Sequence, residues 1–146
     1  MREILYRGLH RRKGEKVWLN GEPVESKWVY GGYCQYNEER GIIYQTEPEI
    51  AKFPVYADTV GQYTGLTDKN GKKIFEGDIV LFTDCWDMQH KGVVYWCSGS
   101  YNVDCSKSDN KEVSVRLFTA YACGAKIIGN IHDNPELLGD EENETD

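Results

Sequence analysis

The sequence lacks any long hydrophobic run and any segment that resembles a leader peptide. A membrane-spanning helix needs roughly 18 consecutive apolar residues, and charged residues interrupt every apolar run well before that length. Arg2, Glu3 and Arg7 stand where a signal peptide would need its apolar core. We therefore expect a protein that is not exported, has no membrane partner and stays in the cytoplasm.

Cysteine occurs in an odd number and never at the two-residue spacing of common redox and zinc motifs. Structural zinc sites usually take ligands in pairs two to four residues apart. Here four, six and seven residues separate the successive members of the candidate set Cys85, His90, Cys97 and Cys105. We expect reduced thiols, no metal site and no cofactor. The five cysteines are Cys34, Cys85, Cys97, Cys105 and Cys123.

Motifs of common enzymes are also absent, because the sequence has no P-loop, no dinucleotide fingerprint and no metalloprotease helix. A Cys123–His132 pair would lack the exposed turn that presents a nucleophile. Three carboxylate pairs could bind a cation or serve as acid and base: Glu38 with Glu39, Asp84 with Asp87, and Glu76 with Asp78. Glu76 and Asp78 flank a turn glycine and are better explained as solvated turn residues. We predict no catalytic residues, and an unrecognised metal-dependent enzyme stays as an alternative.

Charge is distributed unevenly over the 146 residues, whose net charge is −7. Residues 140–146 carry five acids and no base, which leaves −2 for residues 1–139. Residues 1–16 have a balance of +4. Short blocks of one sign at chain ends usually remain solvated, so we expect a disordered acidic tail. A total of −7 argues against a protein that coats nucleic acid by bulk charge.

Short β-branched and aromatic runs between turn signals indicate an all-β fold. In the first half, a polar loop separates residues 4–9 from residues 17–19, which predicts a hairpin with a basic loop. Asn20 and Gly21 accept the positive φ of a tight turn, so another strand should follow. Further strands are expected at residues 28–30 and 42–44.

The second half shows the same pattern, with strands expected at residues 92–97, 112–118 and 126–131. Residues 79–82 (IVLF) are apolar at consecutive positions, which predicts a central strand with both faces buried. One short helical turn is expected where Asn134 can cap and Pro135 occupies the first helical position. Short strands at close spacing favour a small barrel or sandwich.

Several of these segments closely resemble the signature of the YopX family. They are residues 61–66 (GQYTGL), 68–71 (DKNG) and 76–80 (EGDIV), followed by 128–138 (IGNIHDNPELL), and residues 2–4 (REI) resemble the family's usual start. The resemblance implies an all-β protein encoded by bacteriophages and prophages, with an N-terminal β subdomain and a C-terminal barrel-like subdomain. It implies no reaction. Most of the distinctive residues are turn and cap residues.

We therefore expect an N-terminal β subdomain at residues 1–52, a barrel-like subdomain at 53–139 and the tail at 140–146. The leading functional hypothesis is a non-enzymatic phage accessory protein that binds itself, as a homo-oligomer, or a host or phage macromolecule. The alternative is nucleic-acid binding through the N-terminal basic hairpin. Its candidate contact residues are Arg7, Arg11, Arg12, Lys13, Lys16 and Trp18.

Overall fold

The structure is a computed structural model that describes residues 3–10, 17–19, 22–24, 28–47, 49–106 and 114–138, with the backbone alone at 17–19 and 22–24. The chain divides into two compact units, Met1–Tyr63 (unit 1) and Thr64–Asp146 (unit 2). The division falls later than residue 52, where it was expected, because Val55 is completely buried in the core of unit 1. The expected acidic tail lies outside the described residues.

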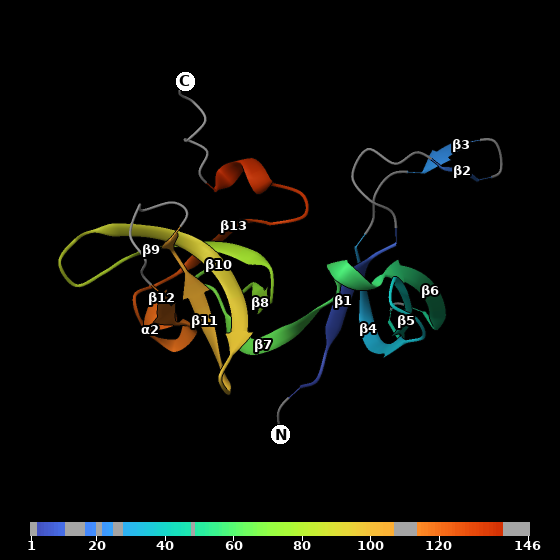
Figure 1. Cartoon of the computed structure of the whole chain (residues 1–146), viewed down its shortest axis with the longest axis horizontal. Helices are drawn as coiled ribbons and strands as arrows, with labels where there is room; N and C mark the ends of the chain where they lie inside the picture. Colours follow the sequence, from blue (N-terminus) through green and yellow to red (C-terminus); the bar gives the residue numbers. More distant parts are fainter. Residues whose placement is uncertain are drawn as a thin grey trace. The chain divides into compact units, whose positions relative to one another are not determined.

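Unit 1 is an antiparallel sheet, in blue to green in Figure 1. Its strand order is β6-β5-β4-β1-β7. A separate ribbon consists of β2 (Val17–Leu19) and β3 (Glu22–Val24). The strands of the sheet are β1 (Tyr6–Leu9), β4 (Trp28–Gln35), β5 (Arg40–Gln45), β6 (Ala51–Tyr56) and the start of β7 (Gly61–Thr67), and the 3-10 helix η1 (Ala57–Thr59) follows β6.

Two turn predictions for unit 1 have opposite outcomes. The hairpin at Asn20 and Gly21 is confirmed, because Leu19 pairs with Glu22 across those two residues. The hairpin between residues 4–9 and 17–19 is wrong, because β1 pairs with β4 and β7 instead. A basic loop can separate two strands that lie in different sheets, and local sequence does not reveal which strand each one pairs with.

The core of unit 1 lies on one face of the sheet, where Val29, Ile43 and Val55 are buried. The sheet curls, so that residues at the end of β1 reach β6 and the segment after it. His10 Nδ1 donates to the Pro54 carbonyl at 2.7 Å, and Leu9 N donates to Thr59 Oγ1 at 2.9 Å. These bonds link segments of unit 1 that are far apart in the strand order.

Unit 2 contains an antiparallel sheet with the order β12-β11-β10-β9-β13. These five strands form an open sheet with β12 and β13 as its edges, so the expected barrel is not closed, and β8 pairs with β7 instead. The elements after β7 are β8 (Lys73–Phe75), β9 (Asp78–Thr83), β10 (Gln89–Cys97), β11 (Ser100–Asp104), β12 (Ser114–Arg116), α2 (Leu117–Ala122), β13 (Lys126–Asn130) and the 3-10 helix η2 (Pro135–Leu137).

The core of unit 2 forms where the sheet packs against α2. Val80, Val94 and Val103 come from three neighbouring strands and are buried together with Leu117 and Ala120 of the helix. The prediction of a central strand is confirmed, because β9 lies between β10 and β13 and Ile79 and Val80 are both completely buried.

The two antiparallel sheets make the fold all-β, as expected. No helix in the described ranges is long and apolar enough to span a membrane.

One element of unit 2 differs from its prediction. The strand expected at residues 112–118 ends at Arg116, and α2 begins at Leu117. Leu117 and Ala120 are three residues apart on the helix, so both face the core, whereas an extended chain would turn them to opposite faces. The helical turn expected near the C-terminus is present as η2, with Pro135 as its first residue.

Candidate functional site

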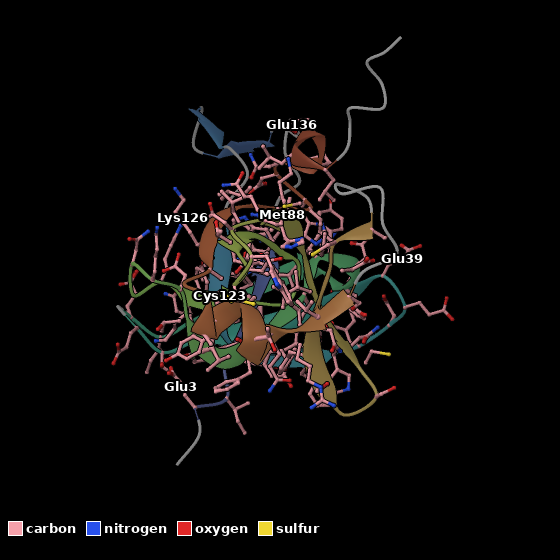
Figure 2. All side chains as sticks on the ribbon, turned by 90° about the vertical axis from the view of Figure 1, so that its left-hand side faces the viewer. Glu3, Glu39, Met88, Cys123, Lys126 and Glu136 are labelled. Atoms are coloured by element: carbon pink, nitrogen blue, oxygen red, sulfur yellow. The ribbon has the colours of Figure 1, made fainter. Side chains whose placement is uncertain are left out.

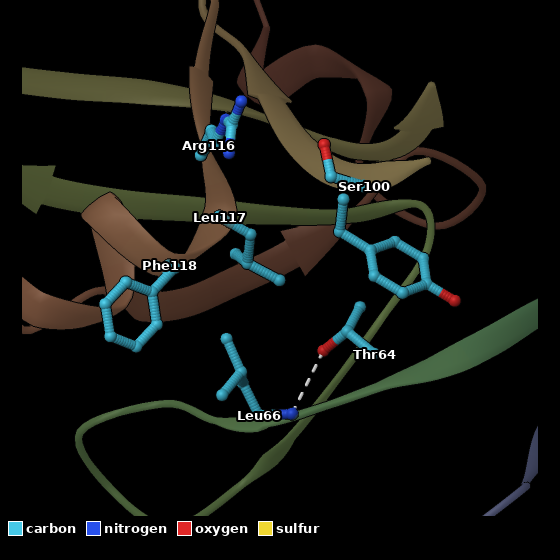
Figure 3. Close-up of a pocket in the computed structure, with 7 residues that line it drawn as sticks. Thr64, Leu66, Ser100, Arg116, Leu117 and Phe118 are labelled. Atoms are coloured by element: carbon cyan, nitrogen blue, oxygen red, sulfur yellow. Dashed lines mark hydrogen bonds between the residues drawn. The ribbon is translucent and has the colours of Figure 1, made fainter. Parts of the chain in front are cut away.

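A pocket of about 210 Å³ opens in unit 2 where β7, β11 and α2 meet (Figure 3). Leu66 and Leu117 give it an apolar lining, and Arg116 lies at the junction of β12 and α2. The volume is enough for a single ring or a branched aliphatic group, since a cavity of about 150 Å³ holds benzene. The lining residues are Thr64, Leu66, Ser100, Tyr101, Arg116, Leu117 and Phe118.

Two aromatic side chains, Tyr101 and Phe118, line this pocket, and the rings of Trp96 and Tyr121 contact them; we call Trp96, Tyr101, Phe118 and Tyr121 the aromatic rim. The Trp96 and Tyr101 rings are 4.8 Å apart, and the Phe118 and Tyr121 rings are 5.8 Å apart. Phe118 is 66% exposed, Trp96 52% and Tyr121 42%. Large apolar side chains gathered on one exposed surface often mark a binding site.

The polar side chains that line the pocket are Thr64, Ser100, Tyr101 and Arg116. The Thr64 hydroxyl donates to the Ile74 carbonyl at 2.8 Å and accepts from Leu66 N at 3.3 Å, so it supports the backbone. None of the described residues that line the pocket is a histidine, cysteine, aspartate or glutamate. The arrangement can hold an apolar group beside the positive charge of Arg116.

The rim was not identified from the sequence, because its members come from β10, β11 and α2. Trp96 and Tyr101 face each other across the hairpin of β10 and β11. One local signal was available: Phe118 and Tyr121 are three residues apart and alternate with Leu117 and Ala120. That spacing is typical of an amphipathic helix whose outer face carries aromatic residues.

A second polar cluster organises the turn between β9 and β10. Asp84 Oδ1 accepts from the backbone N–H groups of Trp86 and Met88, both at 2.9 Å, and Oδ2 accepts from His90 Nε2 at 2.8 Å. The bond from His90 is the largest cause that lowers the pKa of Asp84 below its ordinary value of 3.8. The sequence suggested a pair of Asp84 with Asp87, but the partner is His90.

Two aspartates of the family motifs are structural. Asp68 Oδ1 accepts from Asn70 N and Lys72 N, and Oδ2 accepts from Ile127 N at 3.0 Å. Burial raises the pKa of Asp68, but these hydrogen bonds outweigh it, so the pKa lies below its ordinary value. Asp78 was expected to be a solvated turn residue; it is buried instead, and Oδ2 accepts from Phe75 N at 2.8 Å.

The candidate nucleic-acid contacts are described only in part. Arg7 is 7% exposed, and its guanidinium lies 4.5 Å from the centre of the Trp28 ring, within the packing of unit 1. Trp18 belongs to β2, where only the backbone is described. Arg11, Arg12, Lys13 and Lys16 lie outside the described residues. Nucleic-acid binding by these basic residues therefore stays a prediction, whereas the hairpin expected to present them is wrong, because β1 pairs with β4 and β7.

The candidate zinc ligands do not come together. Cys105 is buried in the core of unit 2, whereas Cys85 and Cys97 are exposed. His90 and Cys97 both lie on β10, seven residues apart, which is roughly 23 Å along an extended strand. Within the described ranges, no group of three or more metal-ligating side chains is close enough to hold an ion.

Comparison with family models agrees with the motifs. A family model described as YopX protein matches residues 6–139. Among solved structures, the chain is similar to the crystal structure of protein EF1440 from Enterococcus faecalis, with 20% sequence identity and a TM-score of 0.48. That match covers 95% of this chain and 100% of the other. None of the curated proteins matches the chain.

Proposed function

The chain belongs to the YopX family, a family of uncharacterised function, and on that premise we propose that it is a non-enzymatic accessory protein that acts by binding. In this proposal, which follows the resemblance of its motifs to phage and prophage proteins, the chain is encoded by a phage or prophage and acts in the cytoplasm of a host bacterium. Its first partner in this proposal is a second copy of the same chain. Binding to another host or phage macromolecule is the broader form of the same function.

The observation that carries this proposal is the apolar pocket with its aromatic rim. Phe118, the most exposed member of the rim, lines the pocket directly. Burial of apolar surface contributes roughly 25 cal/mol per Å², and aromatic side chains supply much of the binding energy at protein interfaces. The lining offers shape and apolar area without a nucleophile–base pair, which favours recognition over catalysis.

Sheet edges support a second copy as the partner. The short strand β12 (Ser114–Arg116) is an edge of the sheet of unit 2 and leads directly into α2, which carries Phe118 and Tyr121. Exposed strand edges are commonly covered by subunit pairing, and most soluble homo-oligomers use the same surface on both subunits. An interface centred on the rim would cover the apolar surface beside this edge.

Light scattering on the purified protein, coupled to size-exclusion chromatography, tests the proposal. We expect the wild-type protein to elute as a dimer or larger oligomer and the variant Phe118→Asp to elute as a monomer, since an acid on the rim would be desolvated at the interface. Trp86→Asp is the matched control, because it puts the same charge on a highly exposed aromatic position outside the rim. A wild-type monomer at all concentrations would refute self-association.

Nucleic-acid binding through the basic segment that contains Arg11, Arg12 and Lys13 is the alternative function. It rests on the +4 balance of residues 1–16 and on the tendency of small β proteins to bind single strands with cations and aromatic rings. It predicts association that weakens with salt and falls further when Arg11, Arg12 and Lys13 are changed to alanine. Absence of a salt slope would exclude it.

A further inference from the structure

The sheet of unit 1 has an outer face on the side away from its core, and of the candidate nucleic-acid contacts Arg7 lies on this side, opposite Tyr30 in the register. Side chains alternate between the two faces of a strand, and the core residues Val29, Ile43 and Val55 define the inner face. The registers place Gly32 opposite Tyr44 and Tyr44 opposite Lys52 on the outer side. The outer face on β4, β5 and β6 comprises Trp28, Tyr30, Gly32, Cys34, Arg40, Ile42, Tyr44, Lys52, Pro54 and Tyr56.

This outer face has cations and no acid. Lys52 is exposed, and neither it nor Arg40 takes part in an ion pair among the described residues. Residues 1–63 contain nine acidic and nine basic residues, so a face without acids is a local segregation of charge. Glu39 lies instead on the turn between β4 and β5, as Figure 2 shows. The face therefore favours a negatively charged ligand.

Two tyrosine rings are accessible on the same face. Tyr30 is 44% exposed and Tyr44 43%. The register makes them diagonal neighbours on adjacent strands, a relation in which Cα atoms lie about 7 to 8 Å apart. Gly32 lies directly opposite Tyr44, and a Cβ atom added at Gly32 would meet nothing within 4 Å. The backbone at Gly32, next to the two rings, is therefore not covered by other side chains.

At the other end of the face, a cation is already stacked on an aromatic ring. The Arg40 guanidinium lies 4.3 Å from the centre of the Tyr56 ring. Stacking fixes the plane of the guanidinium and leaves its charge without a carboxylate partner. Lys52 lies directly opposite Tyr44 in the register, and Arg40 is four residues from Tyr44 along β5, roughly 13 Å. One cation therefore lies beside the exposed ring, and a second lies further along the same face.

We propose that the outer face of unit 1 binds single-stranded nucleic acid, with unpaired bases stacked on Tyr30 and Tyr44 and phosphates held by Lys52 and Arg40. Exposed rings interleaved with cations are the usual means of binding single strands without sequence preference. Bases in a duplex are paired and stacked, so their faces are not available to the two rings. This ligand and surface are distinct from the second copy proposed to bind at the rim.

Fluorescence anisotropy with a labelled oligothymidine of about 12 nucleotides tests this inference across a salt series. We expect log K to fall with log salt at a slope of about −0.7 for each phosphate neutralised, hence about −1.4 for two contacts. Lys52→Glu should make the slope shallower by about 0.7. Tyr44→Ala should weaken binding by about 5- to 100-fold and leave the slope unchanged.

Two controls separate this surface from general charge and aromatic effects. Lys69→Glu makes the same charge change at an exposed position of unit 2, and Trp86→Ala removes an exposed ring there. Both should bind like the wild type. Equal weakening by Lys69→Glu, duplex binding as tight as single-strand binding, or no binding at low salt would overturn the inference. If only changes at Arg11, Arg12 and Lys13 weaken binding, the basic segment is the site and the outer face is not.

Discussion

Single residues in the family motifs act mainly on the backbone, as the turn and cap chemistry of the sequence indicates. Asn130 Oδ1 accepts from the N–H groups of His132 and Asp133, both at 2.9 Å. A Cβ atom at Gly129 would lie 2.6 Å from Asn134 Oδ1, so only glycine fits there without movement. Asn134 was expected to cap η2, but its side chain accepts from Asn130 N instead. The residue types predicted where the turns lie, but they did not predict which hydrogen-bond partner each side chain has.

Asp68 shows where local reasoning ends, because one of its donors is Ile127, fifty-nine residues further along the chain. In Asp68→Asn, an amide oxygen can still accept from Asn70 N and Lys72 N, but the amide nitrogen would face the N–H of Ile127. A buried donor left without an acceptor costs about 1 to 3 kcal/mol. We expect a loss of that size in the free energy of unfolding, measured by urea denaturation at pH 7.

The control for this variant is Asp87→Asn, which makes the same chemical change in an exposed turn. Surface substitutions of this kind usually alter stability by less than about 0.5 kcal/mol. If Asp68→Asn is as stable as Asp87→Asn, the three hydrogen bonds of Asp68 are not what connects its turn to β13.

Elements with strong local signals were predicted from the sequence, and elements that depend on distant partners were not. The central strand β9 and the turn at Asn20 and Gly21 carry their own patterns of hydrophobicity and turn residues. By contrast, α2 has six residues and no side-chain cap, so neither length nor capping marks it. The partners of β1 lie far along the chain. The pocket was missed for the same reason, since three separate segments build it.

The turn between β9 and β10 should depend on pH. The folded-state pKa of Asp84 lies below its ordinary value, with the bond from His90 as the largest cause. Stabilisation of the turn is therefore fully present above about pH 4, the usual pKa of the unfolded chain. It is lost as pH falls through the lower folded pKa, because a protonated carboxyl accepts these hydrogen bonds poorly.

Nuclear magnetic resonance of the backbone amides measures this directly. From pH 7 down to pH 3, the Trp86 and Met88 amide resonances should hold their positions until about pH 4 and then shift together. In Asp84→Ala, the two amides should exchange rapidly with solvent already at pH 7. Slow exchange in that variant would mean that Asp84 does not hold the turn.

At the scale of the whole chain, the distribution of charge and apolar surface matters more than the totals. Residues 1–63 have no net charge, and the −7 belongs entirely to residues 64–146. The argument that a negative net charge disfavours nucleic-acid binding therefore applies to unit 2. The outer face of unit 1 has no acid on its strands. Composition alone could not show this, because the separation depends on which side of each strand a residue occupies.

The central claim is that the protein acts by binding through the aromatic rim of unit 2. Hydrogen–deuterium exchange at low and high protein concentration tests it most directly, because it both detects association and locates the surface involved. We predict slower exchange at high concentration in residues 96–101 and 117–123, with no change in the turn at residues 84–88. Exchange that is independent of concentration, or protection confined to other segments, would contradict the claim.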